Sequence, residues 1–120
     1  MRTRITRLFT FEAAHRLEWH AGRCKRLHGH HYQLEVTLAG TLDDNGVIMD
    51  FDEMDALVTE ELISRWDHEY LNDILSNPTA ERLASEAWLA LEPLFEVRGV
   101  KMESLRLWET PRSMVELLAQ

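Results

Sequence analysis

The sequence contains a single cysteine, Cys24, among its 120 residues. One thiol cannot form a disulfide within the chain, so packing must hold the fold together, and a reducing compartment suits the protein. No apolar run approaches the ~20 residues that span a bilayer, and the basic start at 1–7 is not followed by a secretory apolar segment. These absences predict a cytoplasmic protein.

Positive charge is also scarce. Thirteen lysines and arginines stand against 21 aspartates and glutamates, which gives a formal net charge of -8. This balance argues against nucleic acid or an anionic membrane as a partner, although a local basic patch could still hold a small anion. With 45% hydrophobic residues and no repeats or linkers, the chain is expected to form one domain, residues 1–120.

Period-two alternation predicts the strands. Residues 4–15 and 28–39 place apolar residues on one parity and mostly polar residues on the other. Residues 47–49 are expected to add a short continuation after an Asp-Asn-Gly turn. Residues 100–109 and 113–118 predict a final hairpin.

A first helix is predicted over residues 51–65. Asp50 and Glu53 stand at the spacing of a capping box, and apolar residues recur at helical spacing after them. The next segment, residues 66–73, has no clear period and is expected to be a structured loop.

Thr79 is typical of the N-cap of a second helix, which is expected to end near Leu91 because Pro93 follows. The predicted order is β-β-α-α-β-β. This order indicates an α+β domain with two helices on one face of an antiparallel sheet.

Three histidines are the strongest chemical pattern. His28 and His30 share one parity, so on a strand both imidazoles point to the same face. His15 has the core-facing parity at the end of the preceding strand. Three protein ligands with one open position are typical of catalytic zinc, although imidazole sites also accept copper, nickel or iron. His31 falls on the polar parity and is not included.

Cys24 lies four residues before His28 and allows two readings. As a fourth ligand it would close a structural site of one cysteine and three histidines. As a thiolate favoured by its positive neighbours it would act as a base or nucleophile near the metal.

A second group of candidates surrounds these residues. Asp67 beside His68 can orient a proton-transferring imidazole, and Glu109 at a strand end can accept two hydrogen bonds from a heterocycle edge. Basic residues in the loop before His28 could hold a phosphate-bearing substrate. They are Arg16, Arg23, Lys25 and Arg26.

These residues occur in an order that resembles the 6-pyruvoyl-tetrahydropterin synthase family. The resemblance covers nearly the whole chain and depends on five motifs. They are Phe11-Glu-Ala-Ala-His15-Arg, Cys24-x-x-x-His28-Gly-His30, Trp66-Asp-His68-x-x-Leu-Asn72, Asn77-Pro-Thr-x-Glu81 and Trp108-Glu109-Thr110. The cysteine-histidine spacing is similar to the bacterial 6-carboxytetrahydropterin synthase branch of queuosine biosynthesis.

The resemblance implies a tunnelling fold whose subunits form trimers that stack into a homohexamer, with active sites at subunit interfaces. It implies zinc on the three histidines, Cys24 as the general base, and Asp67 with His68 as a proton relay. It also implies that Glu109 anchors a pterin ring, with Thr79 and Glu81 nearby, while Arg16, Lys25 and Arg26 hold a triphosphate.

The implied reaction converts 7,8-dihydroneopterin triphosphate to 6-carboxytetrahydropterin, acetaldehyde and triphosphate. One alternative is a 6-pyruvoyl-tetrahydropterin synthase or related side-chain lyase that uses the same site. The other is a structural zinc protein, closed by Cys24, that is not an enzyme.

Overall fold

A long antiparallel hairpin of two strands, β1 (Thr3–His15) and β2 (His28–Gly40), organises the protein. The computed structural model describes all of residues 1–120. The register pairs Thr3 with Gly40 at one end and His15 with His28 at the other. The buried residues follow the predicted parity, so both strands turn one face toward the core and the histidines lie at the far end of that face.

The sheet has five strands in the order β3-β1-β2-β4-β5. β4 (Lys101–Thr110) and β5 (Ser113–Leu118) form the predicted final hairpin. β4 pairs with the side of β2 that faces away from β1. The segment expected to be a loop instead contains β3 (Glu69–Tyr70) and a 3-10 turn, η3 (Leu71–Asp73). β3 pairs in parallel with the end of β1, whose outer backbone groups would otherwise lack partners there.

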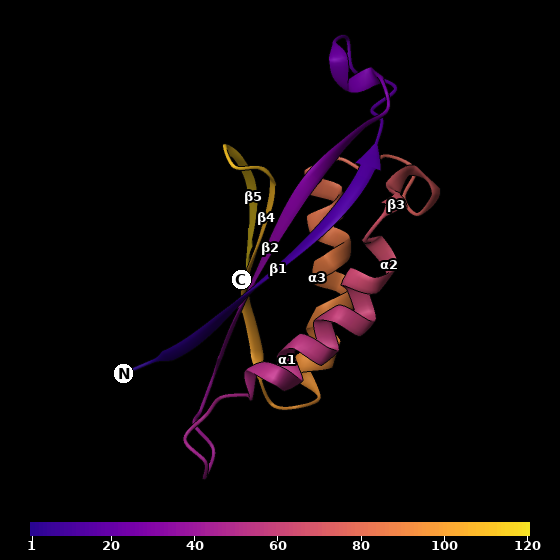
Figure 1. Cartoon of the computed structure of the whole chain (residues 1–120). Coiled ribbons are helices and arrows are strands. Elements are labelled where there is room, and N and C mark those ends of the chain that lie inside the picture. The colour runs from indigo at the N-terminus through magenta and orange to yellow at the C-terminus, as the bar shows by residue number, and fades with distance from the viewer.

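The helices cover one face of this sheet (Figure 1). The first helical run is longer than predicted and changes its winding along its length. α1 (Phe51–Val58) leads into a π segment, η2 (Thr59–Ile63), and then α2 (Ser64–Trp66). The π turn accommodates one extra residue per turn and keeps Leu62 and Trp66 buried on the core side.

Only half of the expected capping box is present. Asp50 caps α1 by accepting a hydrogen bond from the backbone N–H of Asp52. The Glu53 carboxylate instead accepts a hydrogen bond from Arg98 at 3.1 Å. A residue distant in sequence therefore binds the carboxylate that was expected to complete the capping box.

α3 (Ala80–Glu96) starts at the predicted cap, since Thr79 accepts a hydrogen bond from the Arg82 N–H. The predicted end near Leu91 is wrong, because the helix continues through Pro93. Pro93 leaves the Leu89 carbonyl without its helical donor, but Leu89 is exposed and water can supply one. The burial of Phe95, two residues after Pro93, favours the continued helix.

The expected strand at residues 47–49 is also wrong. Asp43 accepts hydrogen bonds from the backbone N–H groups of Asn45 and Val47, which holds this segment as a turn. Ile48 and Met49 then bury their side chains in the core and lead directly into α1.

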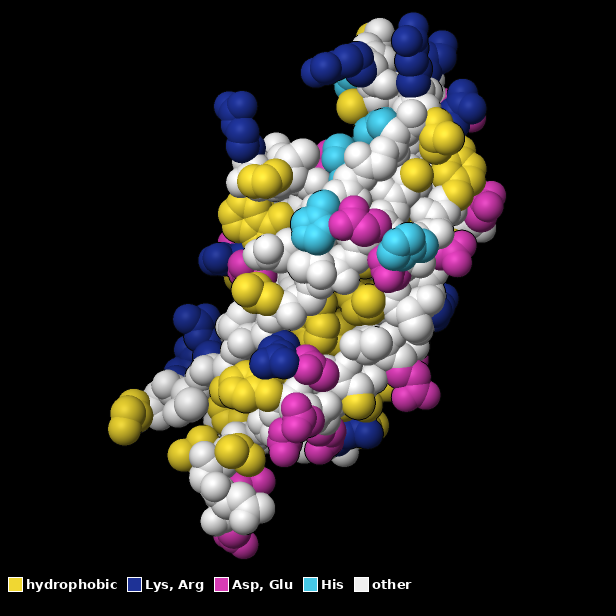
Figure 2. All heavy atoms as spheres, in the orientation of Figure 1, with side chains coloured by type: hydrophobic (Ala, Val, Ile, Leu, Met, Phe, Trp, Pro, Cys, Tyr) yellow, Lys and Arg dark blue, Asp and Glu magenta, His cyan; other side chains and the backbone are white.

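The core is a single cluster of 23 buried hydrophobic residues between the sheet and the helices. The loop between β1 and β2 extends past this core, carries η1 (Arg23–Lys25), and exposes Arg23, Lys25 and Arg26 (Figure 1). Figure 2 shows lysine and arginine side chains gathered at this end of the molecule. None of the helices combines the length and the apolar character of a membrane-spanning segment.

Candidate metal centre

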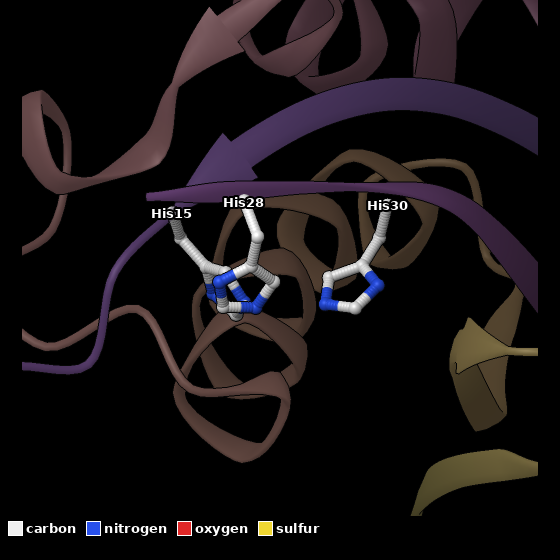
Figure 3. A group of neighbouring side chains, drawn as sticks. All are labelled: His15, His28 and His30. Carbon is white, nitrogen blue, oxygen red and sulfur yellow. The ribbon is translucent and has the colours of Figure 1, made fainter. Parts of the chain in front are cut away.

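The β1–β2 register brings the three predicted histidines together. His15 and His28 are direct partners at the last pair of the hairpin, and His30 lies two residues further along β2 on the same face. Figure 3 shows the three imidazoles on one side of the strands. Their ligand nitrogens all lie within 4.8 Å of one another. The arrangement could therefore hold a metal ion.

Backbone carbonyls orient two of the rings. His15 donates its Nδ1 hydrogen to the Pro78 carbonyl at 2.8 Å, and His28 donates its Nδ1 hydrogen to the Arg26 carbonyl at 2.7 Å. In the neutral rings, Nε2 then carries a lone pair, and these two Nε2 atoms lie only 3.1 Å apart. Two facing lone pairs need a cation between them, and a carbonyl bonded to the second ring nitrogen is the usual support of a metal-binding histidine.

Burial reinforces the neutral form of the rings. His15 is 1% exposed, and desolvation lowers its pKa against the opposing effects of the Pro78 carbonyl and Glu109. Desolvation also lowers the pKa of His30, whose Nε2 is buried without a hydrogen-bond partner. Neutral imidazole is the form that binds metal, and a ligand role accounts for this otherwise unpaired nitrogen.

A carboxylate borders the histidines. Glu109, at the end of β4, places Oε1 3.8 Å from Nε2 of His30 and Oε2 4.0 Å from Nε2 of His15. The predicted strand-end glutamate therefore lies beside the candidate ligands, a contact that its position in the sequence did not reveal.

A buried phenol lies behind the same rings. The Tyr32 ring centroid is 5.6 Å from that of His30, and its hydroxyl is buried without a hydrogen-bond partner. Burial, with a smaller effect of Glu109, raises its pKa. Tyr32 lies on β2 with the same parity as His28 and His30.

Asp67 and His68 are held against β1 through one residue. The Glu12 N–H donates to the Asp67 carboxylate at 2.9 Å, and the His68 N–H donates to the Glu12 carbonyl at 2.5 Å. The first of these bonds is the main reason that the pKa of Asp67 is lowered, with His68 adding to it. His68 has φ 61°, which directs its ring back so that Nδ1 lies 3.0 Å from Asp67. The expected carboxylate-imidazole pair is therefore formed.

Two open hollows flank the histidine end of β2, each of about 470 Å³. One is lined by residues that include His30, Trp108 and Glu109. The other is lined by residues that include His30 and His68. His30 lines both hollows, with Glu109 on one and His68 on the other.

Cys24 is half-buried on η1, and its sulfur is not among the clustered ligand atoms. The loop that carries it is anchored near its base, where the Leu17 N–H donates to the Cys24 carbonyl at 2.7 Å. A site closed by Cys24 as fourth ligand is therefore not what this structure contains.

Asn72, which was assigned no role from its motif, holds the base of the loop. Its side chain accepts from the Arg16 N–H and donates to the Arg16 carbonyl, both at 2.9 Å. The Arg16 guanidinium lies 3.7 Å from Glu18. These bonds fix the point where the chain leaves His15, and the exposed Lys25 and Arg26 lie beyond it.

The segment before α3 supports the site through its backbone. The Pro78 carbonyl orients His15, while the Thr79 hydroxyl is engaged as the helix cap. Glu81 is exposed on the first turn of the helix. The Thr79 hydroxyl thus contributes to the helix start that follows Pro78.

The protein is an α+β sheet protein whose central hairpin brings together one buried and two partly buried imidazoles that could hold a metal ion. A sequence model described as 6-pyruvoyl tetrahydropterin synthase matches residues 4–120. The chain belongs to this family.

Relatives in sequence include proteins of different names. A 6-carboxy-5,6,7,8-tetrahydropterin synthase of Haemophilus influenzae is 28% identical over 94% of this chain and 96% of its own. A 6-carboxy-5,6,7,8-tetrahydropterin synthase of Synechocystis is 39% identical over 73% of this chain and 74% of its own. The dihydroneopterin monophosphate aldolase of Pyrococcus furiosus is 36% identical over 98% of both chains.

Solved structures confirm the fold. The 6-pyruvoyl tetrahydropterin synthase of Caenorhabditis elegans superposes with a TM-score of 0.86 over 100% of this chain and 97% of its own, at 21% identity. At that identity the likeness establishes the predicted tunnelling fold alone.

Proposed function

We propose that the protein is a 6-carboxy-5,6,7,8-tetrahydropterin synthase of queuosine biosynthesis. It would convert 7,8-dihydroneopterin triphosphate to 6-carboxytetrahydropterin, acetaldehyde and triphosphate. The observation that carries this proposal is the cluster of His15, His28 and His30 beside Glu109, in a chain whose relatives include several proteins of that name.

Zinc is the metal proposed for the three imidazoles. The donor set fits, because three neutral nitrogen ligands leave a fourth position that a substrate oxygen can occupy during the reaction. Zinc held there would polarise the hydroxyls of the substrate side chain and acidify the adjacent C–H bond.

Cys24 is proposed as the base that takes this proton. It lies between Arg23 and Lys25 on the loop that leads to His28, a place from which its thiol could approach a bound side chain. A required free thiol also suits the reducing cytoplasm. His68, oriented by Asp67, would exchange the proton at the opposite side of the substrate.

Glu109 is proposed to accept hydrogen bonds from the pterin ring, in the hollow that it lines with Trp108. Thr79 and Glu81 are proposed to lie near that ring. Arg16, Lys25 and Arg26 would hold the triphosphate at the basic end of an otherwise acidic protein.

A homohexamer built as a dimer of trimers is the proposed assembly, with no nucleic acid or membrane partner. Two features support self-association. β5 is an unpaired edge strand, and β1 is paired on its outer side only at Ala13 and Ala14. The hollows at the metal centre are also open, so a neighbouring subunit would be needed to enclose a pterin.

A second candidate is a dihydroneopterin monophosphate aldolase, favoured by 36% identity over 98% of both chains to the Pyrococcus furiosus protein. The same base and metal would serve a retro-aldol cleavage of the side chain. A 6-pyruvoyl-tetrahydropterin synthase is a third possibility that uses the same groups.

Product analysis separates these candidates. Zinc-loaded protein is incubated with dihydroneopterin triphosphate or dihydroneopterin monophosphate, and the products are identified by mass spectrometry. We expect 6-carboxytetrahydropterin and acetaldehyde from the triphosphate, and none from Cys24→Ala. A 6-hydroxymethyl pterin from the monophosphate would identify the aldolase, and a pyruvoyl product the sibling synthase.

A further inference from the structure

Glu109 lines the hollow that is proposed for the pterin ring and also approaches two of the three histidines. Its two carboxylate oxygens divide between two candidate ligands, with one 3.8 Å from His30 Nε2 and the other 4.0 Å from His15 Nε2. No other carboxylate makes such a contact with the three histidines.

These distances can be compared with the geometry of zinc. A tetrahedral site with ligands about 2.0–2.1 Å from zinc has neighbouring ligand atoms about 3.4 Å apart. The two Glu109 contacts exceed that edge by roughly half an ångström. The distance of 3.1 Å between the Nε2 atoms of His15 and His28 is slightly shorter than the same edge. Glu109 thus lies near two of the three ligand nitrogens without belonging to the compact histidine group, and a side-chain rotation would bring one of its oxygens toward the fourth corner of the tetrahedron.

Charge favours the same placement. Three neutral imidazoles bring no negative charge to a divalent cation, whereas an ionised carboxylate offsets half of its charge. Glu109 is 25% exposed at its side chain, so it is shielded enough for this attraction to be strong and free enough to move.

We infer that Glu109 is the fourth zinc ligand in the substrate-free protein and leaves the metal when a pterin ring takes up its carboxylate. The inference rests on the proposed function for the pterin step only. The Glu109 carboxylate then binds either the metal or the pterin ring. Binding of the ring therefore lowers the affinity for zinc, and binding of zinc lowers the affinity for the ring. The open metal position is created only when the substrate is in place.

Zinc affinity tests the ligand role without any turnover. Dissociation constants are measured by competition with a chromophoric chelator for wild type, Glu109→Gln and Glu103→Gln. Glu103 lies on the same strand, six residues away, and pairs with Arg2 and Arg4 instead of the histidines. We expect Glu109→Gln to bind zinc on the order of 10- to 100-fold more weakly, and Glu103→Gln to match wild type. Equal affinity of all three overturns the inference.

A pterin that lacks a side chain tests the release step, because it can bind Glu109 but offers no hydroxyl to the metal. Added to the cobalt-substituted wild type, it should change the visible spectrum and weaken metal affinity. The spectrum of cobalt-substituted Glu109→Gln should already differ from that of wild type. Added to this variant, the pterin should change neither the spectrum nor the metal affinity. Pterin binding to wild type without either change overturns the release step.

The outcomes for the two proposals are distinguishable. If wild type binds no zinc, both fall. If Glu109→Gln weakens zinc binding while dihydroneopterin triphosphate is not consumed, the ligand role stands and the proposed reaction falls. If the reaction proceeds and Glu109→Gln binds zinc like wild type, only the ligand role falls.

Discussion

His15 and His28 face each other across the last pair of the β1–β2 hairpin with their Nε2 atoms 3.1 Å apart. Each ring has already directed its Nδ1 hydrogen to a backbone carbonyl, of Pro78 and Arg26 respectively. Neutral rings in this orientation have no hydrogen to share across the shorter contact. A cation between them resolves the conflict, and His30 supplies a third lone pair.

Loss of one imidazole should therefore abolish tight metal binding. His30→Gln should lower zinc affinity by more than the roughly 10- to 100-fold that loss of an outer-shell partner costs. His31→Gln is the matched control, because His31 is the next residue, is exposed, and pairs with Glu12 on the other face of the sheet. Chelator competition measures both affinities. An equal effect of the two variants would contradict the assignment.

The stability of the metal-free protein should depend on pH near the histidine range. Burial lowers the pKa values of His15 and His30, so the folded protein holds fewer protons than the unfolded chain below about pH 6.5. Their contribution is full above that pH and is lost as the pH falls through the lowered pKa values. The lowered pKa of Asp67 acts only in a more acidic window.

Urea unfolding in the presence of a chelator, from pH 8 to pH 5, measures this dependence. The free energy of unfolding should decline below about pH 6.5, with a smaller decline in His30→Gln than in His31→Gln. A wild-type curve that stays flat over this range would show that the two rings are not held neutral by burial.

Thr79→Ala should destabilise the protein by about 1 kcal/mol, because the hydroxyl caps α3 through the Arg82 N–H. Thr79→Ser keeps the capping oxygen and should restore most of this stability. Unfolding in urea gives both values. If Thr79→Ala leaves the free energy of unfolding unchanged but weakens substrate binding, then substrate contact, and not capping, is the principal role of the hydroxyl.

Tyr32→Phe should leave the free energy of unfolding unchanged or raise it by up to about 1 kcal/mol, since the hydroxyl is buried without a partner. The ring, stacked on Phe11 at 4.8 Å, remains in place. Leu34→Ala, at an equally buried position of the same strand, should cost about 2–5 kcal/mol. A loss above about 1 kcal/mol in Tyr32→Phe would mean that its hydroxyl has a partner in solution.

The histidine cluster could be predicted from the sequence because period-two alternation is a local property. His28 and His30 share a face on any strand, and the core-facing parity of His15 placed it on the same side of the neighbouring strand. The capping of α3 by Thr79 was local as well and was predicted correctly.

The parts that failed depend on contacts between distant residues. Glu53 leaves its cap for Arg98, and α3 continues past Pro93 because Phe95 packs into the core. Likewise, no local pattern shows that Glu109 reaches His15 or that Asn72 holds the loop base at Arg16. Sequence spacing does not reveal such pairs without the fold.

Acetaldehyde release from dihydroneopterin triphosphate tests the central claim most directly. The protein is stripped with a chelator, divided, and assayed with and without added zinc, with His30→Gln and His31→Gln treated in parallel. We predict release only in zinc-restored wild type and His31→Gln. Release at the same rate from stripped wild type, or from zinc-treated His30→Gln, would contradict a metal-dependent synthase built on the three histidines.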